Sequence, residues 1–262
     1  MIAISDNVQT RRDGPSGTIV INRPDRRNAL SPEIVEMISE ALEDFHAERS
    51  VRAVILTGTG DTFCSGTDLH QLKETSESRD AFRIWHDEAK TFLDLIEKML
   101  RFPKPIISSV NGWVVGSGVS LMLASDIVVA GNNSNLLLPE ALRGLNAGVT
   151  TPLLSFRLGT SSASSILYSG APVSAAESKS LGLFHELVED DLLWARCFEI
   201  AKQCAAGARE SHQMTKQLIN ETIGENLFTQ LSIGAANMAA ARTTESAKEG
   251  INAFLDKREP KW

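Results

Sequence analysis

The arrangement of apolar residues along the chain is the feature that most constrains its fold. Short β-rich runs occur at 18–22, 53–57, 106–110, 127–130 and 136–138. Between the earlier runs, apolar residues recur at helical spacing, and beyond residue 152 the pattern is helical with breaks at glycines. Strands that alternate with helices are typical of a parallel or mixed α/β sheet. The sequence therefore predicts an α/β core followed by a helical C-terminal part.

Several local signals refine this outline. Ser31-Pro32-Glu33 predicts the start of a helix, because it combines a capping residue, a proline in the first turn and an early acid. Residues 61–80 are polar and irregular, which indicates a loop with a helical turn. Residues 111–118 are rich in glycine and indicate a turn between a strand and a helix, and a last helix is expected at 245–257.

Composition and charge exclude some classes of function. The 262 residues include 33 acidic and 26 basic ones, and the net charge of −7 argues against a general binder of nucleic acid or anionic membranes. Three cysteines without a C-x-x-C pair indicate reduced thiols, so a cytoplasmic protein is expected. We see no signal peptide and no apolar run approaching the ~20 residues that span a bilayer.

Familiar catalytic motifs are absent from the sequence. The chain has no H-E-x-x-H, no phosphate-binding loop and no G-x-S-x-G, and its five histidines lack metal-ligand spacing. We therefore expect no metal. What remains are two glycine-bearing turns, at 63–69 and 111–118, each of which follows a predicted strand. Two backbone N–H groups aimed from such turns at one oxygen would form an oxyanion hole; alternatively, the glycines only make tight turns.

At these residues the chain resembles the crotonase (enoyl-CoA hydratase/isomerase) family. The resemblance covers most of the length, and the order and spacing of its motifs are specific. It includes Asn22-Arg23-Pro24 with Asn28-Ala29-Leu30, Phe63-Cys64-Ser65-Gly66-Thr67-Asp68-Leu69, Asn111-Gly112-Trp113 with Gly116-Ser117-Gly118, Pro139-Glu140, and Phe254-Leu255-Asp256-Lys257-Arg258. It implies a ClpP/crotonase-like spiral of ββα units at 1–200 and a C-terminal helical trimerisation region at 201–262.

The resemblance also implies roles for particular residues. The backbone N–H groups of Thr67 and Ser117 would hold the carbonyl oxygen of an acyl-CoA thioester as negative charge builds on it. The residues implied to bind CoA are Arg26, Arg27, Ser65, Gly66, Asp68, Leu69, Gly116 and Lys257, the last from the same or a neighbouring subunit. Cationic side chains there suit an anionic ligand, although a solvated basic turn is the alternative for the arginines. No cofactor beyond the CoA of the substrate is implied, and a homotrimer or hexamer is expected.

The acid/base residues depart from the family pattern. Hydratases of the family carry two glutamates; this chain keeps one as Glu140 and has Ser120 at the position of the other. The apolar run before Glu140 would raise the pKa of its carboxyl by desolvation, which suits proton transfer; alternatively, Glu140 only opens a helix. A hydroxyl at Ser120 is no carboxylate base, but it can hold a water molecule.

One retained glutamate leaves several reactions open. A single base can move a proton from C2 to C4, which is double-bond isomerisation, while hydration assisted by Ser120 is expected to be slower. A hydratase-lyase, an acyl-CoA hydrolase and a catalytically weak CoA-binding scaffold are the alternatives. The segment 146–151 also lacks a glycine-rich stretch that is frequent in the family, so an unusual acyl group is expected. No role is assigned to His70 or His86.

Overall fold

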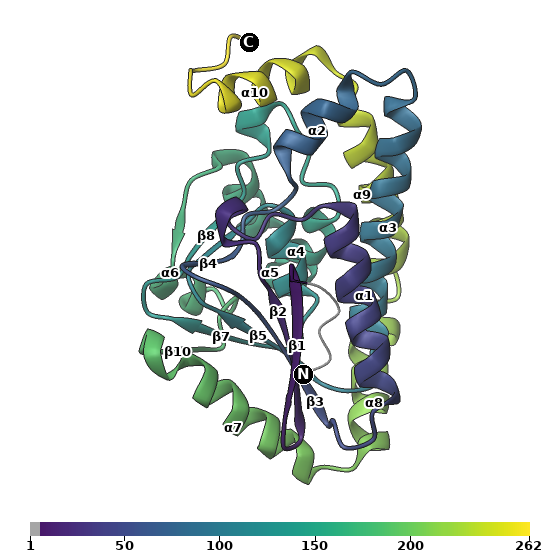
Figure 1. Cartoon of the computed structure of the whole chain (residues 1–262), viewed down its shortest axis with the longest axis vertical. Coiled ribbons are helices and arrows are strands. Elements are labelled where there is room, and N and C mark those ends of the chain that lie inside the picture. Colours follow the sequence, from purple (N-terminus) through teal and green to yellow (C-terminus); the bar gives the residue numbers. More distant parts are fainter. Residues whose placement is uncertain (1–5) are drawn as a thin grey trace.

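The computed structural model describes residues 6–262, which are organised around two β-sheets (Figure 1). The larger sheet has the order β1-β2-β3-β5-β7-β10. Its strands are β1 (Val8–Asp13), β2 (Ser16–Ile21), β3 (Ala53–Gly58), β5 (Ile106–Val110), β7 (Ile127–Gly131) and β10 (Glu186–Val188). The β1–β2 hairpin is antiparallel, and every other neighbouring pair is parallel.

The second sheet is smaller and has the order β4-β6-β8-β9. Its strands are β4 (Thr62–Cys64), β6 (Trp113–Val115), β8 (Asn135–Leu137) and β9 (Val173–Ser174). The pairs β4–β6 and β6–β8 are parallel. Each of these strands follows a strand of the larger sheet and precedes a helix, in the successions β3-β4-α2, β5-β6-α4 and β7-β8-η2. The predicted spiral of ββα units is thereby confirmed.

Helices cover both faces of the larger sheet. Those that precede the C-terminal region are η1 (Pro24–Arg26), α1 (Pro32–Ala47), α2 (Leu69–Ser76), α3 (Ala81–Arg101), α4 (Ser117–Leu123), η2 (Ala141–Arg143), α5 (Thr150–Ser169), α6 (Ala175–Ser180), η3 (Asp190–Leu192) and α7 (Leu193–Ala206). They are followed by α8 (Arg209–Gln217), the π-helical turn η4 (Leu218–Ile223), α9 (Leu227–Ala241) and α10 (Glu245–Leu255). Figure 1 shows α1, α3 and α9 together on one flank, with α7 apart from them. Within residues 6–262, no helix combines the length and apolar character needed to cross a bilayer.

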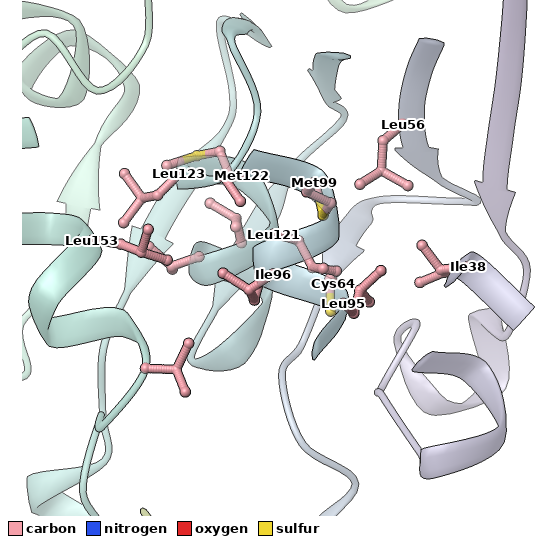
Figure 2. Packing of buried hydrophobic residues seen from close by; sticks show 14 of the residues in the cluster. Ile38, Leu56, Cys64, Leu95, Ile96, Met99, Leu121, Met122, Leu123 and Leu153 are labelled. Atoms are coloured by element: carbon pink, nitrogen blue, oxygen red, sulfur yellow. The ribbon is translucent and has the colours of Figure 1, made fainter. Parts of the chain in front are cut away.

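The main core lies between the sheets and the α1–α3–α9 flank. Alternate residues of β3 separate its two faces, because successive side chains of a strand point in opposite directions. Val54 and Leu56 belong to the main core, whereas Ala53 and Ile55 pack with α7. Figure 2 shows how α4, with Leu121 and neighbouring residues, enters the middle of the main core. Helix α4 is therefore rigidly held, which matters because it begins at the candidate site.

The sequence located most of the regular elements, including β8, but missed the six-residue strand β1 and the short strands β4, β6, β9 and β10. Ser31 caps α1 by accepting a hydrogen bond from the N–H of Ile34, as the sequence predicts. Residues 61–80, expected to form a loop with a helical turn, contain the helix α2 and also the strand β4, and the glycine-rich segment 111–118 contains β6. The region beyond residue 152 also contains β9 and β10. Strands of two or three residues are too short to show a period in the sequence.

A buried asparagine fixes the turn around η1 against the second sheet. The side-chain amide of Asn28 donates hydrogen bonds to the carbonyl oxygens of Thr59 and Thr62 at 2.9 and 2.6 Å, and its Oδ1 accepts one from the N–H of Arg23 at 2.9 Å. Asn28 is fully buried and has a φ of 56°. Because three hydrogen bonds converge on one side chain, the polypeptide on either side of Asn28 has little freedom. The Arg26-Arg27 turn is thus held in place before any ligand binds.

Candidate active site

The carboxyl ends of the adjacent parallel strands β4, β6 and β8 lie at the same edge of the second sheet. Cys64 of β4 pairs with Val114 of β6, so Thr67 and Ser117 lie the same number of residues beyond a paired position. Glu140 follows β8, the next strand of the sheet. Residues at the carboxyl ends of adjacent parallel strands are brought together by the sheet itself. The fold thus gathers Thr67, Ser117 and Glu140 from three distant parts of the sequence.

Two glycines allow the turns after β4 and β6 to approach closely. Gly66 has a φ of 83° and Gly116 a φ of 55°, a region that other residues rarely adopt. A Cβ on Gly66 would lie 2.9 Å from the carbonyl oxygen of Val115 and 3.2 Å from the nitrogen of Ser117. Any side chain at Gly66 would therefore force the turns apart. These glycines do more than reverse the chain, because they let one backbone pass directly against the other.

The turns present two backbone donors without partners. Among residues 6–262, the N–H groups of Thr67 and Ser117 make no hydrogen bond, although their neighbours do: the N–H of Asp68 bonds to Leu30, and the N–H of Val119 bonds to Gly116. The hydroxyls of Thr67 and Ser117 are 3.0 Å apart and form a hydrogen bond with each other. Two free N–H groups tied together in this way can stabilise an oxyanion that forms between them.

Glu140 meets the Gly116 turn with a buried carboxylate, one oxygen of which has no hydrogen bond. Its Oε1 lies 3.0 Å from the position that a Cβ on Gly116 would occupy, and its Oε2 is buried without a hydrogen bond. Burial raises the pKa of Glu140 to about 7, although the backbone N–H of Glu140 and the charge of Arg143 act in the opposite direction. A carboxyl with this pKa exists in both protonation states near neutral pH. It can therefore accept a proton and return it.

Ser120 lies one turn into α4 and is fully buried. Its hydroxyl forms a 2.8 Å hydrogen bond with the hydroxyl of Thr150, the first residue of α5. Thr150 belongs to the segment 146–151, where the sequence departs from the family pattern, but nothing in the sequence indicated this contact. The position of the family's other glutamate is thus taken by a paired, neutral hydroxyl.

The residues expected to bind CoA fall into two groups. Beside the site, the N–H and hydroxyl of Ser65 donate hydrogen bonds to the carbonyl oxygens of Arg27 and Arg26, which places both exposed arginines against the Ser65–Leu69 segment. Asp68 is buried, caps α2 and forms a 3.2 Å ion pair with Arg23, and Leu69 begins α2. These contacts give the carboxylate of Asp68 a structural role.

The second group is the single residue Lys257, which is exposed just after the end of α10, with a φ of 53°. Helix α10 packs against α2 and η2 (Figure 1). His70 and His86 are both exposed. Within residues 6–262, no cluster of histidine, cysteine and acidic side chains is suited to a metal ion.

A pocket opens beside the two turns. Together with the space that is open to solvent it measures about 440 Å³. Its walls come from the α1 start, α2, α3 and α9, and they are lined by Leu30, Ser31, Pro32, Val35, Thr67, Asp68, Gln71, Leu72, Glu88, Phe92, Ser117, Met238 and Arg242. Thr67 and Ser117 therefore join the pocket to the turn that Glu140 contacts. The sequence did not identify Glu88 or Arg242 as residues of the site.

Comparisons with known proteins agree with this geometry. The sequence pattern of the family described as enoyl-CoA hydratase/isomerase matches residues 16–262. A "Putative enoyl-CoA hydratase" of Thermus thermophilus is 33% identical over 95% of this chain and 98% of its own length. The "1,2-epoxyphenylacetyl-CoA isomerase" of Escherichia coli is 28% identical over 94% of both chains. A carnitinyl-CoA dehydratase structure from Mycobacterium avium 104 has a TM-score of 0.81 at 30% identity and covers 98% of this chain and 99% of that one.

The two sheets and their ββα units have the crotonase fold, an enzyme scaffold. The chain belongs to the enoyl-CoA hydratase/isomerase family. Its function at the level of the family is therefore that of an enzyme acting on an acyl-CoA thioester. Because relatives that are similar over nearly their whole length are named both hydratase and isomerase, the family leaves the particular reaction open.

Proposed function

We propose that this enzyme moves the double bond of a 3-enoyl-CoA to the 2-position, with Glu140 as the acid and base. The observation that carries the proposal is the carboxylate of Glu140, with a pKa of about 7. It contacts the Gly116 turn, one of the two turns that each present a free N–H group. Ser120, at the place of a second carboxylate, is buried and bonded to Thr150. One proton-transfer group suffices for isomerisation, whereas hydration also needs a group that activates water.

The proposed reaction has two proton transfers. The thioester oxygen accepts hydrogen bonds from the N–H groups of Thr67 and Ser117, and the carboxylate of Glu140 removes a proton from C2. The C2–H electron pair becomes the C1=C2 bond of a dienolate, and the carbonyl pair moves onto the thioester oxygen, where the N–H groups stabilise the charge. Protonated Glu140 then returns the proton to C4. When the C3=C4 pair takes up this proton, the C1=C2 pair shifts to C2=C3 and the carbonyl is restored. Atoms and charge balance, and no redox cofactor or metal takes part in these steps.

We further propose that Arg26, Arg27 and Lys257 contact the phosphates of CoA and that the protein assembles as a homotrimer or a pair of trimers. The exposed positions of these cations support the first part. Exposed apolar residues of α8, η4 and α9, among them Met214, Leu218 and Ile223, support the second. Light scattering would give the oligomeric mass. Lys257→Ala would weaken CoA binding if the contact is made.

The test of the reaction is product identification with two substrates. The protein is incubated separately with a 3-enoyl-CoA and a 2-enoyl-CoA, and products are followed by mass and ultraviolet absorbance. The proposal expects conjugation without a change of mass from the 3-enoyl substrate. Addition of one water to the 2-enoyl substrate as the dominant reaction would make the protein a hydratase, which the name of the Thermus thermophilus relative favours. Release of free thiol would indicate a hydrolase, and CoA retention without turnover would indicate a scaffold.

The pH dependence of isomerisation follows from the pKa of Glu140. Proton removal from C2 requires the carboxylate, and burial raises the pKa of this group to about 7. We therefore expect kcat/KM to rise with pH, about tenfold per unit well below this pKa, and to level off above it. Steady-state rates with a 3-enoyl-CoA across the neutral range would check this. A profile that is flat through pH 7 would contradict the assignment of Glu140 as base.

Ser120→Ala separates the two possible reactions. Removing the hydroxyl leaves that of Thr150 buried without its partner, which costs about 1 kcal/mol of stability. We expect isomerisation to change by less than about tenfold, because Ser120 transfers no proton in it, while any residual hydration falls by about 10² or more. Ser108→Ala is the matched control, because Ser108 forms a similar buried hydrogen bond with Ser125 at 2.9 Å. Loss of isomerisation in Ser120→Ala alone would contradict the proposed mechanism.

A further inference from the structure

The pocket beside the active-site turns contains an ion pair that the proposed proton transfer does not use. Arg242, just after α9, donates a hydrogen bond from Nη1 to Oε2 of Glu88 on α3 at 2.8 Å. The side chains of Arg242 and Glu88 are only 5% and 15% exposed. Both residues line the same pocket as Thr67 and Ser117. The space next to the thioester site is thus bounded in part by two opposite charges.

The pair has unused capacity for hydrogen bonds. Among residues 6–262, the contact with Glu88 is the only hydrogen bond that the Arg242 side chain makes, and the same holds for Glu88. The free Oε1 of Glu88 is an acceptor, and the remaining guanidinium N–H groups of Arg242 are donors. Gln71 adds an amide that lines the pocket and has no side-chain hydrogen bond within these residues. The rest of the wall combines apolar side chains, such as Leu72 and Phe92, with Ser31, Asp68 and the two active-site turns.

A plain hydrocarbon chain fits this wall badly. If it filled the pocket, it would displace water from Glu88 and Arg242 and offer them no hydrogen bond in return. A hydroxyl can donate to Glu88 and accept from Arg242 at the same time. Sites built to bind a substrate hydroxyl discriminate strongly against the analogue that lacks it. The charges therefore select for polarity in the acyl group.

The balance of charge argues for a neutral polar group over a carboxylate. Arg242 is already paired with Glu88, so an incoming carboxylate would face the negative charge of Glu88. Burial raises the pKa of Glu88 against the opposing effect of Arg242, and the charge of Glu33 adds to the rise, so Glu33 makes the surroundings more negative. The other acid of the pocket, Asp68, is paired with Arg23. No cation of the pocket is left free for an anionic substrate group.

We propose that the acyl group of the substrate carries a hydroxyl beyond its reacting carbons, which is bound by Glu88 and Arg242. This inference rests on the proposed function, because it assumes that the acyl chain of the thioester enters the pocket beside Thr67 and Ser117. It assigns specificity to two side chains that take no part in the proton transfer. It also accounts for a buried charged pair beside the apolar side chains of the pocket wall.

Equilibrium binding tests the inference without requiring turnover. Saturated acyl-CoA thioesters with a hydroxyl at successive carbons beyond C4 are compared by calorimetry with matched unsubstituted and carboxylated thioesters. We expect one hydroxylated member to bind about 10–100-fold more tightly than its unsubstituted match. Equal or tighter binding of the unsubstituted thioester would overturn the inference. Tighter binding of the carboxylated thioester would also overturn it and would indicate an anionic acyl group.

Two variants locate the preference. Glu88→Leu with Arg242→Met removes both charges together, so no buried charge is left alone, and the preference for the hydroxyl should disappear. Glu88→Gln retains the shape but leaves Arg242 unpaired, so the carboxylated thioester should gain at least about tenfold relative to the hydroxylated one. The control replaces Glu43 by glutamine and Lys98 by methionine, an ion pair on the outside of α1 and α3, and should leave all ratios unchanged.

The outcomes of this experiment and of the reaction test are independent. A hydroxyl preference that survives the double replacement of Glu88 and Arg242 would overturn the role of these two residues. If the first double variant does not fold, the binding ratios of the unmodified protein and of Glu88→Gln decide the question. Failure to isomerise any 3-enoyl-CoA, together with a clear hydroxyl preference in binding, would reject the proposed reaction and retain the specificity site. Efficient isomerisation without a hydroxyl preference in binding would retain the proposed reaction and reject the specificity site.

Discussion

Replacing Glu140 by glutamine is expected to lower kcat for 3-enoyl-CoA isomerisation by about 10²–10⁴-fold, the usual contribution of a general acid or base. Glutamine has the same shape but cannot take the proton from C2. The free N–H groups of Thr67 and Ser117 are unaltered by this change, so acyl-CoA binding should be nearly unaffected. Stopped-flow absorbance and calorimetric binding would measure the two effects separately. Retention of full activity would remove Glu140 from the mechanism.

The same substitution is expected to stabilise the protein at alkaline pH. The pKa of Glu140 is raised to about 7 in the folded protein, above its value in an unfolded chain, so the folded state holds the proton more tightly. Ionisation therefore destabilises the fold, and this penalty grows as pH rises from about 4.5 toward 7 and then stays constant. Glu140→Gln should thus gain about 1–3 kcal/mol in unfolding free energy at pH 8 and little at pH 4.

Urea unfolding at both pH values would measure this difference. Glu177→Gln provides the matched control, because Glu177 is exposed on α6 and the change should alter neither activity nor the pH dependence of stability. A variant that is inactive and also less stable at pH 8 would contradict the prediction, since it would mean that the carboxylate stabilises the fold. A variant that is active but more stable would contradict the catalytic assignment alone.

Gly116→Ala is expected to have the second largest effect, a fall in kcat of about 10²–10³-fold. An alanine Cβ would meet Oε1 of Glu140 at 3.0 Å and would occupy a backbone conformation with a φ of 55° that side chains disfavour. Relief of this strain rotates the turn and misdirects the N–H of Ser117. The strain should also cost about 1–3 kcal/mol of stability. Rates with 3-enoyl-CoA and urea unfolding would measure both consequences.

Gly182→Ala controls for backbone strain alone. Gly182 has a φ of 82°, and a Cβ there would meet no atom within 4 Å. It follows α6, away from the three strand ends that form the site. We expect a similar loss of stability and an unchanged kcat per folded molecule. If Gly182→Ala lowered kcat as much as Gly116→Ala, the catalytic effect would have to be attributed to general destabilisation.

The sequence predicted the parts of the site that depend on local backbone chemistry. Gly66 and Gly116 mark positions that need a positive φ, and Glu140 follows an apolar run that buries it. Such features depend on only a few consecutive residues, so a sequence pattern can reveal them. The resemblance to the family then named Thr67 and Ser117 as donors, and the structure leaves the N–H groups of both free.

The contacts that join distant residues were beyond the reach of sequence patterns. Glu88 and Arg242 are separated by 154 residues, and until the two meet they are ordinary charged residues, one within α3 and the other just after α9. Ser120 and Thr150 likewise form a pair only after α4 and α5 have packed. Periodicity reports which face of a helix is buried. It carries no information about which buried polar group faces which.

The burial of Cys64 has a consequence for an enzyme that handles thioesters. This cysteine ends β4, three residues before Thr67, and it is fully buried, with desolvation raising the pKa of its thiol to about 12. Thioesters exchange their acyl groups with thiolates, but at pH 8 only about one molecule in 10⁴ would carry the ionised sulfur. Its burial and raised pKa therefore make Cys64 a poor nucleophile toward the thioester that the proposed site would hold.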